Sequence, residues 1–431
     1  SICDGSTPSF MLAFWARDRV RGPHLPLELL VHRQTRSTAL HYGLADRGLV
    51  APGLRADLNV IDLDGLAIDA GSVGPDEKRT TGRLDVIRPE LLAALTWSLD
   101  SGNVAIAGSI VTALAGPLLY RPDHELIASI RGIGAHRAIV GSPIEPAVVA
   151  ADARAAFLIG DLDEVRTLAE HALDLADASE LPTRHRASHA LGVVSLYRGN
   201  FDDSCTAFGS IVDDPGAAIV ARLDALGGLA LARCYSGNLD GARSVAQQHR
   251  AIAETLPSDT YVAFADYALA EIDLAGGEVD TAVDRLVAAA DRAWETQARF
   301  VWGIASTVLA RVLVRHRPPI YARTRLPGLI ERWQHTATWP QLWTALRLAA
   351  EHLAATDDPR TALLILEAAD RDASAPTMSD DDAEIHVGLR AQIGGILGEA
   401  TATGISSAAI AIERVDVVER VLQALREPLS T

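Results

Sequence analysis

The sequence predicts a mainly α-helical protein, built as an α-solenoid of antiparallel helix pairs. Three observations support this prediction. A turn motif of the form Gly-Asp/Asn/Glu-x-Asp begins at residues 160, 199, 237 and 277, so its spacing is 39, 38 and 40 residues. Small residues keep a fixed distance from each of these turns. Aromatic residues make up only 5% of the chain and hydrophobic residues 48%, a balance typical of closely packed helices.

The first seventy residues differ from this pattern. Residues 26–44 carry apolar side chains at helical spacing and predict a helix, and residues 57–63 alternate well enough to predict one strand. A single strand leaves backbone groups unpaired and its edge open. We therefore expect the 57–63 strand to stay exposed, to lie loosely against the helices, or to pair with a second copy in a self-associated form.

These residues also resemble a known enzyme family. The stretches CDGSTPSF, WARDRVRG, LPLELLVHRQT and YGLADRGLVAPGLRADLNVIDLD are similar to the C-terminal tail of N-acyl-D-amino-acid deacylase-type amidohydrolases. The resemblance covers residues 1–70 and implies a small mixed helix/strand remnant. Asp4 matches a second Asp-Gly of the family pattern rather than the catalytic one, although the alternative that Asp4 is the base stays open.

The metal-binding histidines of that family have no counterpart here. His24, His32 and His41 do not form an HxH pair or a His-Glu-x-x-His helix. Amide hydrolysis of this type needs a metal ion to activate water. The sequence therefore predicts no catalytic residue, no metal and no cofactor.

A Gly-, Ser- and charge-rich stretch, residues 71–83, is predicted to be a linker, and helical repeats follow over residues 84–375. Turns are expected near residues 102, 160, 199, 237, 277, 317 and 357. Residues 376–431 are expected to form C-terminal helices that close the array. One small residue lies seven positions before each turn from 160 onward, and a second small or modest one lies five positions after it: Ala153, Gly192, Ala230, Ala270, Ala310 and Ala350, then Val165, Ser204, Ala242, Ala282, Ala322 and Ala362.

In several repeats a leucine comes directly before the first of these small residues. Such Leu-Gly or Leu-Ala pairs are typical of tetratricopeptide-like repeats. Residues 84–431 resemble the repeat region of bacterial LuxR/AfsR-type transcriptional regulators, which implies an interaction module. No GxxxxGK[ST] phosphate loop occurs in the sequence, and GIGAHRAIVGS at 132–142 lacks the lysine and the Ser/Thr. Only nine residues follow Leu422, which leaves no room for a DNA-reading helix-turn-helix.

The charge and composition of the chain argue against some classes of binding partner. The formal net charge of −17 argues against direct binding of nucleic acid. The longest uncharged stretch, residues 104–120, is shorter than the roughly 20 residues of a membrane span, so no membrane contact is expected. Cys3, Cys205 and Cys234 show no metal-ligand spacing, and a reduced, cytoplasmic chain is expected.

Two groups of residues are candidates for a partner or ligand surface. Arg184, His185 and Arg186, with His189 nearby, suit an acidic or phosphorylated partner; the alternative is a solvated end of a repeat. The second group is a candidate for a ligand- or peptide-binding wall on the concave face, although core packing of irregular repeats is the favoured interpretation; it comprises Trp294, Trp302, Trp333, Trp339 and Trp343.

The sequence thus predicts a non-enzymatic scaffold that binds a protein or peptide partner on its repeats. Two alternatives stay open: an amidohydrolase-type protein or fragment acting on C–N bonds, and a small-molecule sensor that uses the tryptophan-rich end.

Overall fold

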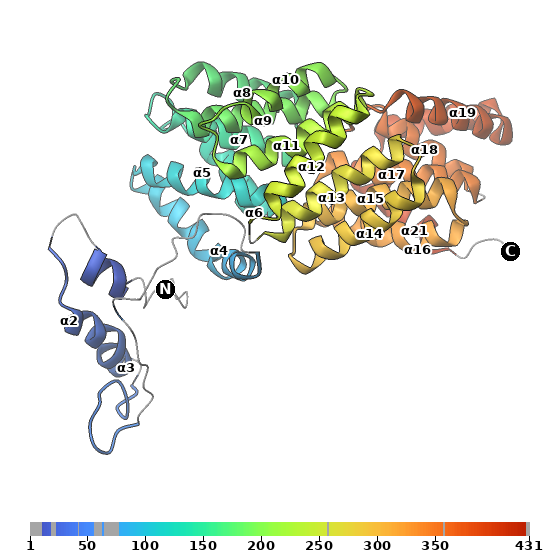
Figure 1. Ribbon diagram of the computed structural model, residues 1–431. Helices are drawn as coiled ribbons and strands as arrows, with labels where there is room; N and C mark the ends of the chain where they lie inside the picture. The colour runs from blue at the N-terminus through green and yellow to red at the C-terminus, as the bar shows by residue number, and fades with distance from the viewer. Residues whose placement is uncertain are drawn as a thin grey trace. The chain divides into compact units, whose positions relative to one another are not determined.

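The computed structural model describes residues 11–18, 23–41, 43–55, 63, 77–256, 258–356 and 358–427, and within them it contains helices and turns but no strand. The chain divides into two units. The first consists of residues 1–74 and 82–90, and the second of residues 75–81 and 91–431. Figure 1 shows the helices, with the array running from cyan to red.

The described part of the first unit is a short helical segment that includes η1 (Met11–Asp18), α2 (Leu27–His32), η2 (Arg33–Ser37) and α3 (Thr38–His41). The last three run on as one helix with a π-helical turn in its middle, which confirms the core of the helix predicted at 26–44. The side chain of Arg36 donates to the carbonyls of Ala45 and Arg47 at 3.1 and 2.9 Å and holds the following loop. The predicted strand at 57–63 lies outside the described residues except for Leu63, as does Asp4.

The second unit is an array of helix pairs. The bounds of its helices are α4 (Glu77–Asp100), α5 (Val104–Tyr120), α6 (His124–Gly134), α7 (Glu145–Ile159), α8 (Leu162–Leu175), α9 (Leu181–Tyr197), α10 (Phe201–Val212), α11 (Ile219–Tyr235), α12 (Leu239–Ala253), α13 (Asp259–Ala275), α14 (Val279–Glu295), α15 (Arg299–His316), α16 (Pro319–His335), α17 (Trp339–Ala355), α18 (Pro359–Ala369), α19 (Asp380–Leu397), α20 (Glu399–Ala411) and α21 (Arg414–Arg426). Helix α4 begins at Glu77, within the stretch predicted as a linker.

Glycines end helices where the repeat register predicted turns. Gly102, Gly160, Gly199, Gly237 and Gly277 all have a positive φ, a conformation that glycine adopts without the steric penalty of a Cβ atom. The expected turns near 317 and 357 also fall between helices, at the junctions of α15 with α16 and of α17 with α18. The predicted helical-repeat architecture is therefore confirmed.

The small residues on either side of each turn lie where the two helices of a pair cross. All twelve are buried. A Cβ atom on Gly192 would lie 2.7 Å from the ring of Phe208, and the Ser204 hydroxyl donates to the Gly192 carbonyl at 2.8 Å. Bulk at these positions would push the paired helices apart.

The first helix of each pair is buried on most sides, and the second on one. In α7, 12 of the 15 residues are buried, whereas in α8 only 4 of the 14 are. First helices also contact one another in a row from α5 through α7 to α17. Helix α5 belongs to this row and contacts α6 as well as α7.

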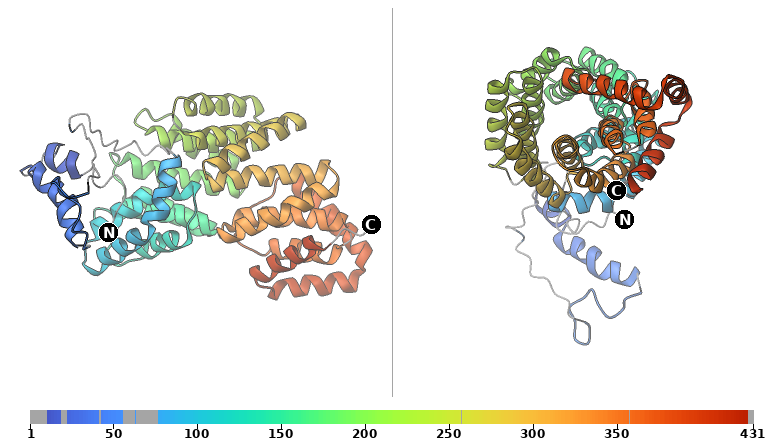
Figure 2. Two further views of the ribbon diagram at one scale, coloured as in Figure 1. Left: turned by 90° about the horizontal axis from the view of Figure 1, so that it is seen from below. Right: turned by 90° about the vertical axis from the view of Figure 1, so that its right-hand side faces the viewer.

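The row of first helices curves back on itself. Phe157 of α7 lies 6.5 Å from Phe300 of α15, centroid to centroid, and Gln341 of α17 donates to the Tyr197 hydroxyl of α9 at 2.5 Å. Helices four pairs apart therefore touch. Viewed from the C-terminal side, the helices of the array lie around a ring (Figure 2).

Candidate interaction surface

The inward-facing polar side chains of the array are bound mainly to one another. Glu271, Arg311 and Glu351 each follow one of the small marker residues and so occupy the same position in successive repeats. Arg311 contacts Glu271 at 2.6 Å, and Arg315 contacts Glu351 at 2.7 Å. The side chains of the two glutamates are only 4% and 8% exposed. These ion pairs join α13, α15 and α17 side by side.

A second polar cluster lies near the start of the array. The Tyr120 hydroxyl of α5 donates to the Asp224 carboxylate of α11 at 2.5 Å, and Tyr261 of α13 donates to the same oxygen at 3.2 Å. Arg154 of α7 lies 3.7 Å from Asp224. Burial raises the pKa of Asp224, and the positive charge of Arg154 opposes that rise. This cluster ties α5 to helices further along the chain.

The predicted Arg184–Arg186 cluster takes part in internal contacts. Arg184 donates to the carbonyl of Ala176 at 3.2 Å, just beyond the end of α8, and His185 Nε2 lies 2.7 Å from Asp214. Arg186 donates to the carbonyl of Thr112, and burial lowers its pKa to about 10. The structure places these side chains on α9, a first helix that packs against α7, α8, α10 and α11, with Arg184 and Arg186 partly exposed and His185 buried.

The structure separates the five tryptophans that were expected to form one concave wall. Trp333 and Trp343 are each only 1% exposed and belong to the core. The indole N–H of Trp333 donates to Thr307 at 3.1 Å. The ring of Trp339 instead faces Arg414, whose guanidinium carbon lies 5.0 Å from the ring centroid. Trp333 and Trp343 lie in the core because the burial of a large aromatic side chain is strongly favourable.

Trp294 and Trp302 remain together at the surface. Their ring centroids are 5.6 Å apart, and Trp294 is 56% exposed. The guanidinium carbon of Arg332 lies 5.1 Å from the Trp294 ring centroid and 5.2 Å from that of Trp302. The three side chains come from α14, α15 and α16, and we call them the Trp294–Trp302–Arg332 surface.

Packing beneath this surface holds the Trp302 ring in place, and Trp294 lies against that ring. Trp302 packs against a cluster of fully buried residues: Ala263, Ala293, Ala298 and Val301. The Arg121 guanidinium donates to the carbonyl of Thr296 at 2.6 Å, in the turn that joins α14 to α15. A fixed exposed aromatic pair loses little conformational entropy when a partner binds, which is a property of binding hot spots.

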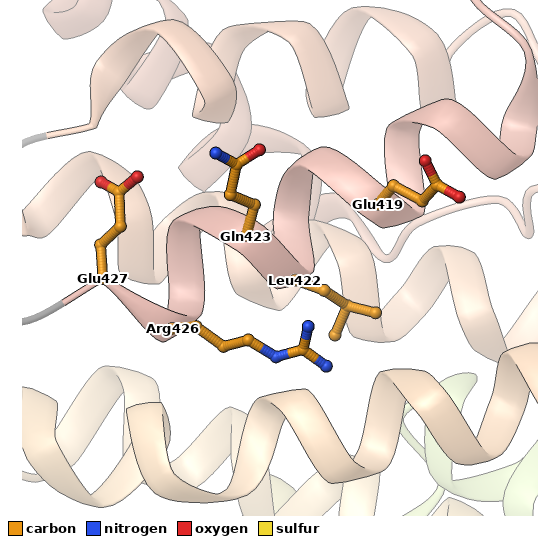
Figure 3. A pocket seen from close by; sticks show the side chains of 5 residues that line it. All are labelled: Glu419, Leu422, Gln423, Arg426 and Glu427. Atoms are coloured by element: carbon orange, nitrogen blue, oxygen red, sulfur yellow. The ribbon is translucent and has the colours of Figure 1, made fainter.

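A shallow hollow of about 530 Å³ lies elsewhere, along α21. Its lining residues are Glu419, Leu422, Gln423, Arg426 and Glu427, and Figure 3 shows them along one helix. Leu422 is the apolar member, and Arg426 is held by Glu331 at 2.5 Å. Four of the five lining side chains are polar or charged, whereas hydrophobic and aromatic residues predominate in the lining of a typical ligand pocket.

Two further properties bear on the kind of site. In the described ranges, no group of three or more His, Cys, Asp or Glu side chains is arranged to hold a metal ion. None of the helices in those ranges is both long and apolar enough to cross a membrane.

Comparison with known proteins shows the fold. The structure is similar to that of a Rap protein complexed with Competence and Sporulation Factor, with a TM-score of 0.52 and 10% identity over 78% of this chain and 99% of that chain. It is also similar, with a TM-score of 0.45 and 13% identity, to a signal transduction ATPase with numerous domains from Pyrococcus horikoshii that has a tetratricopeptide repeat sensor; 97% of this chain and 64% of that chain are covered. The likeness to the Rap protein supports the assignment of the fold as a helical-repeat array.

No protein-family model matches the sequence, and no curated protein matches it. The resemblance of residues 1–70 to amidohydrolases thus gains no support from the comparisons, and neither does a relation to LuxR/AfsR-type regulators beyond the repeat fold.

Proposed function

We propose that this protein is a helical-repeat scaffold that binds a peptide segment of a partner protein on the Trp294–Trp302–Arg332 surface. The observation that carries the proposal is the exposed Trp294, in contact with Trp302 and Arg332 in a chain with few aromatic residues. Tryptophan and arginine are the residue types most enriched among binding hot spots. A regulatory role of the kind implied by the LuxR/AfsR resemblance would use the same surface.

The second helices of the repeats suit such a role because they face outward. Helices α14 and α16 both pack against α15, and each presents its polar side away from the core. The inward-facing carboxylates of the repeats, in contrast, are already bound by arginines of the same chain. An outer surface is therefore the better candidate.

Selection from a phage-displayed library of random peptides tests the proposal. Enriched peptides are expected to lose affinity by about tenfold or more on Trp294→Ala, since hot-spot tryptophans contribute on that scale. The matched control is Trp97→Ala on α4, because Trp97 is 58% exposed and Trp294 56%. Circular dichroism would verify that both variants keep the helical fold. Peptides that bind the Trp294→Ala variant as tightly as the native chain would contradict the proposal.

A further inference from the structure

Basic charge is concentrated beside the proposed surface. The whole chain carries a formal net charge of −17, yet residues 299–335 contain seven arginines and a single acidic residue, Glu331. This segment comprises α15 and α16. This charge pattern is visible in the sequence alone.

Several of these arginines are neutralised or held within the protein. Carboxylates form ion pairs with Arg311, Arg315 and Arg317. The guanidinium group of Arg323 donates hydrogen bonds to two backbone carbonyls. Three others, Arg299, Arg325 and Arg332, form no ion pair with any residue that the structure describes. Glu331 is itself bound by Arg426.

The three unpaired arginines lie around the tryptophans. Arg299 is three residues before Trp302 on α15, so the two side chains share one face of that helix. Arg325 is seven residues before Arg332 on α16, about 10 Å along the same face. Arg325 is exposed, and Arg299 and Arg332 are partly exposed. Positive charge therefore extends from the aromatic pair along two helices.

The guanidinium group of Arg332 has no hydrogen-bond partner among the residues that the structure describes. Both tryptophan rings interact with the guanidinium group by cation–π contacts. The N–H donors of a guanidinium point outward in its plane, so an arginine that lies over an aromatic ring can still bind a carboxylate through two parallel hydrogen bonds. An aromatic ring beside these N–H donors favours a ligand in which an acidic and an apolar side chain lie close together.

We infer that the partner segment is acidic, with carboxylates that meet Arg332 and Arg325 and an apolar side chain that lies on Trp294. This inference rests on the proposed function. Charge complementarity favours it, because the chain as a whole is acidic, whereas this surface carries three arginines without a carboxylate partner among the described residues. A nucleic acid is disfavoured, since its binding needs more phosphate contacts than three arginines on a protein of this net charge provide.

The test uses three fluorescein-labelled peptides with the same phenylalanine and leucine core, flanked by glutamates, glutamines or lysines. Fluorescence anisotropy with the full chain is expected to show that the glutamate peptide binds at least about tenfold more tightly than the glutamine peptide. This preference should shrink at high salt. Arg325→Glu and Arg332→Gln should each reduce it severalfold. The control is Arg137→Glu, because Arg137 is also exposed and lies between α6 and α7.

Two results would overturn the inference. One is equal binding of the glutamate and glutamine peptides, and the other is tighter binding of a thymidine oligonucleotide than of the glutamate peptide. If library peptides depend on Trp294 but show no acidic preference, the inference fails and the proposed function stands. If no library or synthetic peptide depends on Trp294, the proposed function fails and the inference fails with it.

Discussion

Replacing His249 with leucine is expected to stabilise the array, and to do so more strongly in acid than at neutral pH. His249 lies on α12 and is fully buried, beside the rings of Tyr261 and Phe264 at centroid distances of 6.3 and 5.7 Å. Neither ring nitrogen has a hydrogen-bond partner among the described residues. Desolvation lowers the pKa of this imidazole to about 3, because a charged ring would lack both water and a counter-charge.

The sign and size of the pH effect follow from this pKa. The unfolded chain binds a proton at His249 below a pKa of about 6.5, whereas the folded chain does so only near 3, so stability falls as the pH drops below 6.5. At pH 5 the cost is roughly 2 kcal/mol, since the pH is then about 1.5 units below the unfolded pKa. Leucine removes this cost. It also removes two unpartnered polar atoms, whose burial costs on the order of 1–3 kcal/mol at any pH.

Thermal unfolding followed by circular dichroism at pH 7 and pH 5 measures the effect. The gap in Tm between His249→Leu and the native chain should widen at pH 5, whereas the exposed His316→Leu control should show no such change. His189 and His352 also have lowered pKa values, so the comparison between variants, rather than the acid sensitivity of one protein, isolates His249. A gap that is the same at both pH values would refute the reasoning. An NMR signal of the His249 ring that titrates near pH 6.5 would do so directly.

Two further predictions concern the packing of the array. Gly303→Ala would place a Cβ atom 2.2 Å from the Trp333 ring and is expected to lower the free energy of unfolding by roughly 1–3 kcal/mol. The control Gly388→Ala, whose Cβ atom would have no other atom within 4 Å, should leave the free energy of unfolding unchanged or raise it slightly. Equal effects of the two variants in urea unfolding would show that the contact between Gly303 and Trp333 is wrong. Glu271→Gln leaves Arg311 without its buried partner and should cost roughly 3 kcal/mol, of which the double variant Glu271→Leu/Arg311→Leu should recover a large part; a double variant no more stable than the single one would contradict the ion-pair account.

Local chemistry explains which features could be predicted from the sequence. A glycine before a polar cap ends a helix whatever surrounds it, so the turns at Gly160 and Gly199 could be placed from the repeat register alone. Small residues at a fixed distance from each turn mark the points where paired helices cross, because a larger side chain would push the helices apart. Ala153 and Val165, which lie at two of these points, are both fully buried. The location of the candidate surface was only partly predictable: Trp294 and Trp302 were identified as candidates, but with them were Trp333 and Trp343, which are core residues.

The sequence by itself thus determined the helical repeat, its period, the positions of its turns and the residues that allow paired helices to cross closely. The tertiary structure alone decided which helices meet four pairs apart, as Phe157 meets Phe300, and which tryptophans remain at the surface. It also decided that Arg184 and His185 bind within the chain. The physical reason is that a period of 3.6 residues assigns a side chain to a face of its helix, whereas the neighbour of that face depends on rotations accumulated over many repeats.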